Sequence, residues 1–116
     1  MYLARVLAPI VVPIHHPALT AHPLLLVARV EPDGRLDARA HHRVALDTIG
    51  AGEGDLVLVL EEGNSARQLL DDRGAPVRNV VVGFVDEVEI EGRITLRHEA
   101  RPQVGAHAAA PPESVR

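Results

Sequence analysis

Short apolar runs alternate with polar turns through the first 97 residues, and the pattern is mostly that of strands. It predicts six strands, at residues 2–12, 24–30, 36–46 (best defined at 43–47), 56–60, 77–90 and 94–96. One short helix is predicted at residues 65–72, with a capping box formed by Ser65 and Gln68 and a glycine stop at Gly74. Short strands at this spacing predict an all-β fold, a small closed barrel with one short helix. Closure also removes the open edges at which valine-rich strands aggregate.

Several positions predict local departures from regular strands. Pro9 lies inside the first predicted strand and predicts an edge position, or a bend or bulge nearby, because proline cannot donate to a ladder. Residues 31–35 have the composition of a turn. Gly83 permits a bulge in the fifth strand, and the alternation at 87–91 predicts that Val88 and Ile90 face inward.

The stretch from Asp47 to Arg67 is the most distinctive part of the chain. Gly50, Gly52 and Gly54 suit backbone at positive φ or passing close to another chain. The strand at residues 56–60 has no polar residue, which predicts burial of both its faces. A chain of 116 residues has one small core, so a neighbouring subunit is the simplest cover for the second face.

Composition excludes several classes of function. The formal charge is −4, which argues against a phosphate-backbone partner, and aromatic residues make up 2% of the chain, too few for stacking nucleotide bases. There is no cysteine, hence no disulfide or thiolate site. No apolar run approaches membrane-spanning length. We expect a cytoplasmic protein without a nucleic-acid or membrane partner.

Candidate catalytic, cofactor and metal sites are each better explained in another way. The histidines His15, His16, His22, His41 and His42 have no ligand spacing and are interpreted as solvated loop residues. The glycines at 50–54 do not form a phosphate-binding loop on this interpretation, because they precede a strand instead of a helix. Glu53 and Asp55 would also repel a phosphate. The carboxylates at 86, 87, 89 and 91 fit a solvated strand face. We therefore expect no enzyme activity, no cofactor and no metal.

The same stretch resembles the signature of the EutN/CcmL family of pentameric bacterial microcompartment vertex proteins. The residues that match are Asp47, Ile49, Gly50, Ala51, Gly52, Gly54, Asp55, Gly63, Ser65, Ala66 and Arg67. The resemblance extends over about residues 1–96, including Met1–Val6, His16–Leu19, Leu24–Val27 and Val85–Val88. The segment at 8–23 departs from the family pattern at Pro9, Pro13 and Ala21.

The resemblance implies an OB-like β-barrel that assembles as a homopentamer and closes a polyhedral shell in the bacterial cytoplasm. Hexameric and trimeric shell proteins would be its partners. An OB-fold-like module that binds nucleic acid or another ligand is the alternative. We expect residues 1–97 to form the barrel domain and residues 98–116, rich in alanine and proline, to form a tail that is disordered or packs on a partner. Residues 99–116 are expected to be dispensable for the ring.

Two sets of residues are assigned to the expected ring. The subunit interface is expected to contain Asp47, Gly50, Gly52, Gly54, Leu58 and Arg67. The five-fold axis is expected to be approached by Gly63, Asn64 and Ser65, whose helix-start N–H groups favour small polar or anionic species unless the opening is too tight to conduct. Arg67 is placed in the first helical turn, where it either faces solvent or contacts the neighbour.

Overall fold

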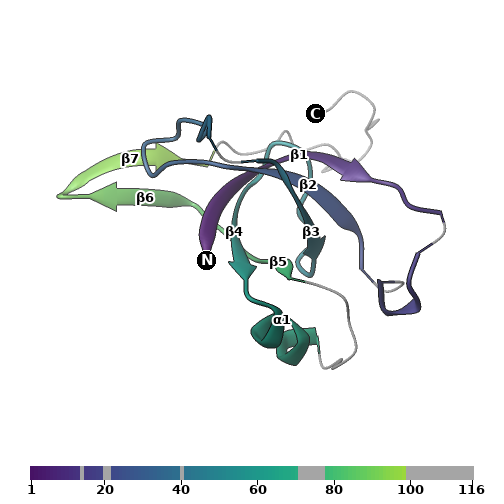
Figure 1. Cartoon of the computed structure of the whole chain (residues 1–116). Coiled ribbons are helices and arrows are strands. Elements are labelled where there is room, and N and C mark those ends of the chain that lie inside the picture. Colours follow the sequence, from purple (N-terminus) through teal and green to yellow (C-terminus); the bar gives the residue numbers. More distant parts are fainter. Residues whose placement is uncertain (14, 20–21, 40, 71–77, 99–116) are drawn as a thin grey trace, which may run out of the picture.

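The computed structural model describes residues 1–13, 15–19, 22–39, 41–70 and 78–98. Five strands close into a barrel in the order β1-β2-β3-β5-β4, which confirms the predicted fold class (Figure 1). Neighbouring strands are antiparallel except β3 and β5, which are parallel. The bounds are β1 Tyr2–Ile10, β2 Leu24–Arg29, β3 Arg43–Asp47, β4 Leu56–Glu61 and β5 Asn79–Phe84.

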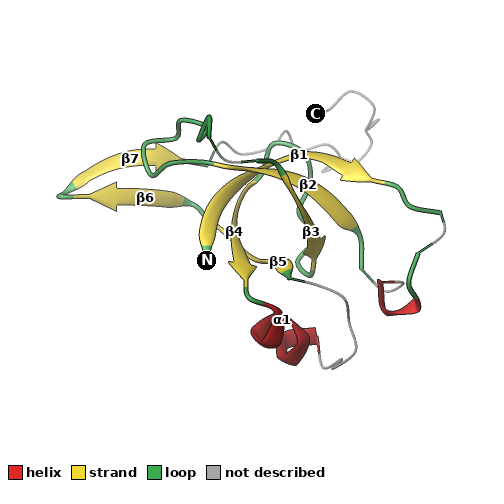
Figure 2. Ribbon diagram, viewed as in Figure 1, coloured by secondary structure: helices red, strands yellow, loops and turns green. Residues whose placement is uncertain are grey.

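The helix α1 (Gly63–Leu70) follows β4, and a 3-10 turn (Pro17–Leu19) precedes β2 (Figure 2). Alternate residues of the strands fill the barrel, and the buried cluster there comprises Tyr2, Ala4, Val6, Leu25, Val27, Ala45, Val57, Val59 and Val81. A second buried cluster joins the helix to the barrel through Ala66, Leu46 and Val80. The aliphatic composition thus builds two small clusters instead of one aromatic core.

The predicted strand at residues 77–90 is wrong as a single element. The barrel strand β5 ends at Phe84, and residues 87–97 form a separate antiparallel hairpin of β6 (Glu87–Ile90) and β7 (Arg93–Arg97). We call this hairpin the arm. Its two-residue loop, Glu91-Gly92, has φ values of 51° and 79°, as a type I′ turn requires. Ile90 is 41% exposed, so its predicted inward position is also wrong.

The predicted bulges are confirmed. The pairing of β1 with β2 shifts between Val6 and Ala8, and β1 pairs with β4 only through Arg5. Pro9 therefore lies where β1 pairs with β2 alone, an edge position of the kind that proline tolerates. The second bulge is on β5 next to Gly83, because Gly83 pairs with Leu58 while Val81 pairs with Val59.

The helix begins earlier than predicted, and its cap is a different residue. Glu62 precedes α1, and its Oε1 accepts a hydrogen bond of 2.6 Å from the amide of Ser65. Ser65 is thus the third helical residue, and the predicted capping box is wrong. Glu62 lies three residues before Ser65, so its carboxylate caps the amide of the third helical residue of the earlier helix start. The predicted stop at Gly74 lies outside the described residues.

Candidate functional site

Two buried aspartates hold the ends of the glycine-rich turn, residues 48–54. Asp47, 3% exposed, accepts hydrogen bonds from the amides of Ile49 (3.1 Å) and Ala51 (3.0 Å) through its two carboxylate oxygens. Asp55, 1% exposed, accepts one from the amide of Gly52 (2.8 Å). Buried carboxylates persist only where such donors replace water. The two acids therefore fix the turn from within the chain.

The turn covers one end of the barrel. Ile49 and Ala51 pack against the interior cluster, and the Thr48 hydroxyl donates to the carbonyl of Val81 (2.9 Å). Gly54 donates its amide to the carbonyl of Val6 (2.8 Å), which ties the turn to β1. Gly50, Glu53 and Gly54 remain exposed to solvent. The apolar side of the turn seals the barrel, and its glycine side faces outward.

Positive φ is found at two of the three glycines. Gly50 has φ of +81° and Gly54 has φ of +89°, both in the left-handed region that favours glycine. Gly52 is not among the glycines with positive φ, so for Gly52 only the other expectation, backbone passing close to another chain, stays a prediction. Its amide and carbonyl are instead both bonded to Asp55. The turn needs glycine conformations at its two outer positions.

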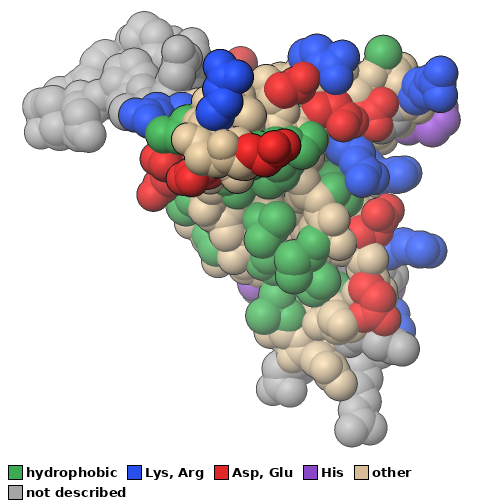
Figure 3. All heavy atoms as spheres, turned by 90° about the vertical axis from the view of Figure 1, so that its left-hand side faces the viewer, with side chains coloured by type: hydrophobic (Ala, Val, Ile, Leu, Met, Phe, Trp, Pro, Cys, Tyr) green, Lys and Arg blue, Asp and Glu red, His purple; other side chains and the backbone are tan. Residues whose placement is uncertain are grey.

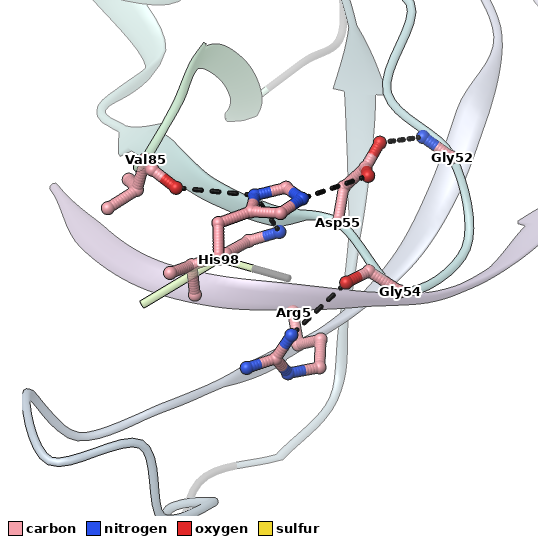
Figure 4. A network of polar contacts seen from close by, with 7 residues as sticks. Arg5, Gly52, Gly54, Asp55, Val85 and His98 are labelled. Atoms are coloured by element: carbon pink, nitrogen blue, oxygen red, sulfur yellow. Dashed lines mark hydrogen bonds and ion pairs between the residues drawn. The ribbon is translucent and has the colours of Figure 1, made fainter. Parts of the chain in front are cut away.

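His98 connects the end of the arm to this turn, a role that no pattern in the sequence predicts. Its Nε2 lies 3.4 Å from Oδ1 of Asp55 (Figure 4). Its Nδ1 lies 3.4 Å from the amide nitrogen of Leu56 and 3.3 Å from the carbonyl oxygen of Val85. In the neutral ring Nδ1 accepts from Leu56, and in the charged ring it donates to Val85. In both forms the ring lies beside Asp55, with Nδ1 within reach of Leu56 on β4 and of Val85 after β5.

The same corner contains Arg5, which the sequence analysis did not single out. Its Nη1 donates to the carbonyl of Gly54 at 3.1 Å (Figure 4). Arg5 lies on β1 directly opposite Leu56 of β4. The exposed side of the turn is therefore held by an arginine and its buried side by two carboxylates.

The outer face of β4 is covered in part by this chain itself. Leu56 is fully buried, and Leu60 packs against the cluster under α1. Leu58 is half-buried and pairs with Leu3 of β1. The expectation that a neighbouring subunit covers this face therefore stays a prediction for Leu58 and does not extend to Leu56 and Leu60. Hydrophobic side chains nevertheless gather at the centre of one face of the molecule, below charged ones (Figure 3).

The remaining predicted site residues lie on α1. Gly63, Asn64 and Ser65 form its first turn, and Ser65 is exposed. Arg67 is the fifth helical residue, so its predicted place in the first turn is wrong. Its guanidinium folds back over Gly63, where an added Cβ would lie 3.1 Å from Nη1. A side chain at position 63 would therefore require a small shift of the Arg67 guanidinium.

A polar cluster surrounds Tyr2 at the start of β1. The Tyr2 hydroxyl donates to Oδ1 of Asn79 at 2.9 Å, and the guanidinium of Arg29 lies 5.2 Å from its ring centroid. Arg43 and Glu61 form an ion pair of 3.6 Å nearby. Burial raises the pKa of the Tyr2 hydroxyl above 10.0, and the charge of Glu61 adds to the rise, against the opposing effect of Arg43 and Arg29.

We expect Tyr2 to titrate above pH 10, the ordinary value. Because the folded pKa is raised, the stabilising contribution of the neutral phenol is present below pH 10 and is lost as the pH rises through the folded pKa. Phenolate absorbance measures this residue alone, since it is the only tyrosine and tryptophan is absent. A titration identical in the folded protein and in urea would contradict the prediction.

The described residues contain neither a metal-binding cluster nor a membrane-spanning helix. No group of three or more histidine, aspartate or glutamate side chains within them could hold a metal ion. None of the helices in that part of the chain has the length and apolar character needed to cross a membrane. The contacts of the turn are those of a structural element.

Comparison with known proteins assigns the class. A family model described as ethanolamine utilisation protein EutN/carboxysome matches residues 1–86. The chain belongs to this EutN/CcmL family. The microcompartment shell vertex protein EutN of Escherichia coli is 40% identical over 94 residues, which cover 81% of this chain and 96% of EutN. The shell vertex protein PduN of Salmonella typhimurium is 43% identical over 88 residues, covering 74% and 96%.

A solved relative agrees in fold. The structure of GrpN from Rhodospirillum rubrum, described as a pentameric microcompartment shell protein, superposes with a TM-score of 0.66 at 32% identity. The match covers 78% of this chain and 99% of GrpN. The chain is therefore a vertex protein of a bacterial microcompartment shell, with a structural and not an enzymatic function. This confirms the family resemblance and the expected location in the shell, and it decides against the nucleic-acid alternative.

Proposed function

We propose that five copies of this chain join head to tail in a closed ring that fills a five-fold corner of the shell. A heterologous interface closes into a ring when its rotation suits the subunit number. Flat layers of hexagonal tiles cannot close into a polyhedron without such corners. The similarity to the pentameric GrpN over almost its whole length supports this assembly.

The edges of the ring meet the flat shell layer. We assign the hexameric and trimeric shell proteins as partners there, with the enclosed enzymes behind them. The function is one of fit, curvature and sealing, which requires a rigid subunit. Two buried carboxylates clamping one turn supply such rigidity next to an exposed surface.

The subunit contact is assigned to the outer face of β4 and the exposed side of the turn. Leu58 and its partner Leu3 are half-buried apolar residues on paired outer positions. Gly50 and Gly54 lack side chains and are exposed, so a neighbour can approach their backbone closely. Asp47 and Gly52 act indirectly, by holding the turn. Arg67 is assigned to the same contact through the α1 end of this face.

Leu58→Glu is expected to convert the ring to monomers while the barrel stays folded. A carboxylate at a half-exposed position is hydrated in the monomer but would be desolvated without a partner in the interface. Sedimentation velocity at micromolar concentration measures the mass, and circular dichroism checks the fold. Leu69→Glu is the matched control, since Leu69 is 53% exposed on α1.

Two outcomes would count against the assignment. If Leu58→Glu still forms rings of unchanged stability, the β4 face is not the contact. If the unaltered protein is a monomer at micromolar concentration, the proposed ring itself is wrong.

The first turn of α1 is assigned to the five-fold axis. Gly63, Asn64 and Ser65 begin the helix, and Ser65 is exposed. Five copies of a residue at the axis lie close together, so Ser65→Cys is expected to form disulfide-linked dimers on mild oxidation. A disulfide needs Cα atoms within about 7 Å. An intact ring without crosslinks would place this turn away from the axis.

A further inference from the structure

The two ends of the barrel are closed in different ways. At one end, the glycine-rich turn covers the interior with Ile49 and Ala51 and holds two buried aspartates. At the opposite end, β1, β3 and β5 begin and β2 and β4 end, because neighbouring strands are antiparallel except for β3 and β5. The ring of Tyr2 lies there and belongs to the interior cluster. We call this second end the mouth.

Each of the five strands places one polar or aromatic side chain at the mouth. Side chains alternate between the two faces of a strand, and each of these residues stands two positions from a residue of the interior cluster. They therefore point toward the barrel axis. The set, which we call the collar, consists of Tyr2 of β1, Arg29 of β2, Arg43 of β3, Glu61 of β4 and Asn79 of β5. Mouths of β-barrels are among the places where proteins bind small molecules.

The collar is connected through Tyr2. The Tyr2 hydroxyl donates to Oδ1 of Asn79 at 2.9 Å. The guanidinium carbon of Arg29 lies 5.2 Å from the centroid of the Tyr2 ring, which is a cation–π distance. Nε of Arg43 lies 3.6 Å from Oε2 of Glu61. The charges of all three ionised groups act on the Tyr2 hydroxyl, so the two arginines are held close to a single phenol ring.

The charges in the collar do not cancel. Arg29 and Arg43 are positive and only Glu61 is negative, which leaves a local excess of positive charge in a chain whose formal charge is −4. Arg29 is exposed, and among the described residues its guanidinium is in no ion pair. The amide nitrogen of Asn79 adds further N–H donors, because its oxygen already accepts from Tyr2. The collar therefore presents hydrogen-bond donors and positive charge to solvent.

These donors match the oxygens of an anion. Guanidinium and amide N–H groups form hydrogen bonds with carboxylate and phosphate oxygens, and a planar guanidinium binds two such oxygens at once. The excess positive charge repels a cation. The ligand must be small, because the interior cluster fills the barrel beneath the collar.

We propose that the collar binds a small oxyanion, a carboxylate or a phosphate group, with Arg29 as its main contact. All five residues of the collar belong to one chain, so the site is complete in a single subunit. The inference therefore goes beyond closure of the shell and does not depend on the proposed ring. It adds a binding activity to the structural function.

The titration of Tyr2 reports whether the collar is occupied. Burial and the charge of Glu61 raise the pKa of the Tyr2 hydroxyl, and the charges of Arg43 and Arg29 lower it. An anion bound to the arginines offsets the lowering effect. Inorganic phosphate is therefore expected to raise the midpoint of the phenolate absorbance by roughly 0.5–1 pH unit relative to sodium chloride of equal ionic strength. Tyr2 is the only tyrosine, and sodium acetate in place of phosphate distinguishes carboxylate from phosphate ligands.

Arg29→Gln is the decisive variant. Because Arg29 is exposed, the barrel is expected to stay folded, which circular dichroism checks. In chloride the variant is expected to raise the Tyr2 midpoint by itself, since one of the two lowering charges is gone, and phosphate is expected to add little to that rise. Arg35→Gln is the matched control, because Arg35 is exposed and pairs with Asp33 in the turn at residues 31–35, outside the collar. It should leave both midpoints unchanged.

Three outcomes would overturn the inference. A phosphate effect of equal size in the unaltered protein and in Arg29→Gln would mean an adventitious ion only. A shift that grows without saturating as phosphate is added would mean general screening of charge. The absence of a shift with both phosphate and acetate would show that the collar binds neither. A monomeric protein with a saturable shift would contradict the proposed ring and support the collar.

Discussion

Asp55→Ala is expected to lower the free energy of unfolding by about 2–4 kcal/mol, because buried polar groups lose their partner. The substitution deprives the amide of Gly52 of its acceptor and leaves Nε2 of His98 without its carboxylate. Urea unfolding followed by Tyr2 fluorescence gives the difference. Glu53→Ala, an exposed carboxylate in the same turn, should change stability by less than about 0.5 kcal/mol. If Asp55→Ala and Glu53→Ala lowered the free energy of unfolding equally, the burial of Asp55 would not be the cause of the loss.

Shortening the chain separates the stabilising effects of the two groups that Asp55 contacts, the Gly52 amide and the His98 ring. A chain ending at Arg97 lacks His98 and is expected to lose less stability than Asp55→Ala, since Gly52 keeps its acceptor. A chain ending at His98 is expected to fold and assemble normally. This treats residues 99–116 as the dispensable tail and moves the proposed domain boundary by one residue. Failure of the longer chain to assemble would assign the tail to the interface.

Gly54→Val is expected to destabilise the fold by about 1–3 kcal/mol, because a β-branched residue is strained at positive φ. Gly54 has φ of +89°, and nothing lies within 4 Å of an added Cβ, so strain and not collision would cause the loss. Gly52→Val lacks this strain and is the matched comparison. Melting temperature measures the fold, and mass in solution measures assembly. A larger loss of melting temperature for Gly52→Val would contradict the assigned conformations.

The strands and the closed barrel could be predicted because hydrophobic periodicity reports burial. The run at 56–60 is a strand because all five residues are apolar, and the turn at 31–35 follows from its composition. The break between β5 and β6 could not be predicted in this way. Residues 77–90 are continuously strand-like in sequence, but the chain leaves the barrel after Val85, whose amide still donates to the carbonyl of Leu56, and residues 87–90 pair with residues 93–97 instead.

Two causes explain why the helix cap was predicted wrongly and why His98 was missed: competition between nearby capping residues, and a long separation in sequence. Glu62 and Ser65 are both possible helix caps, and only their final geometry selects Glu62. The roles of Asp47 and Asp55 could have been predicted, because both flank the glycines and the amides of a turn need hydrogen-bond acceptors. His98 had none, because its partners Asp55 and Leu56 are about forty residues away and no periodicity connects them.

The strand order also sets when the subunit becomes complete during synthesis. β5 is the last barrel strand in sequence, yet it lies between β3 and β4. Until residue 84 has left the ribosome, β3 and β4 each keep an open edge that can join another chain. Such long-range pairing also folds slowly. Ring formation must therefore wait for the finished polypeptide, and the nascent chain is the stage at which this vertex protein is most exposed to misassembly.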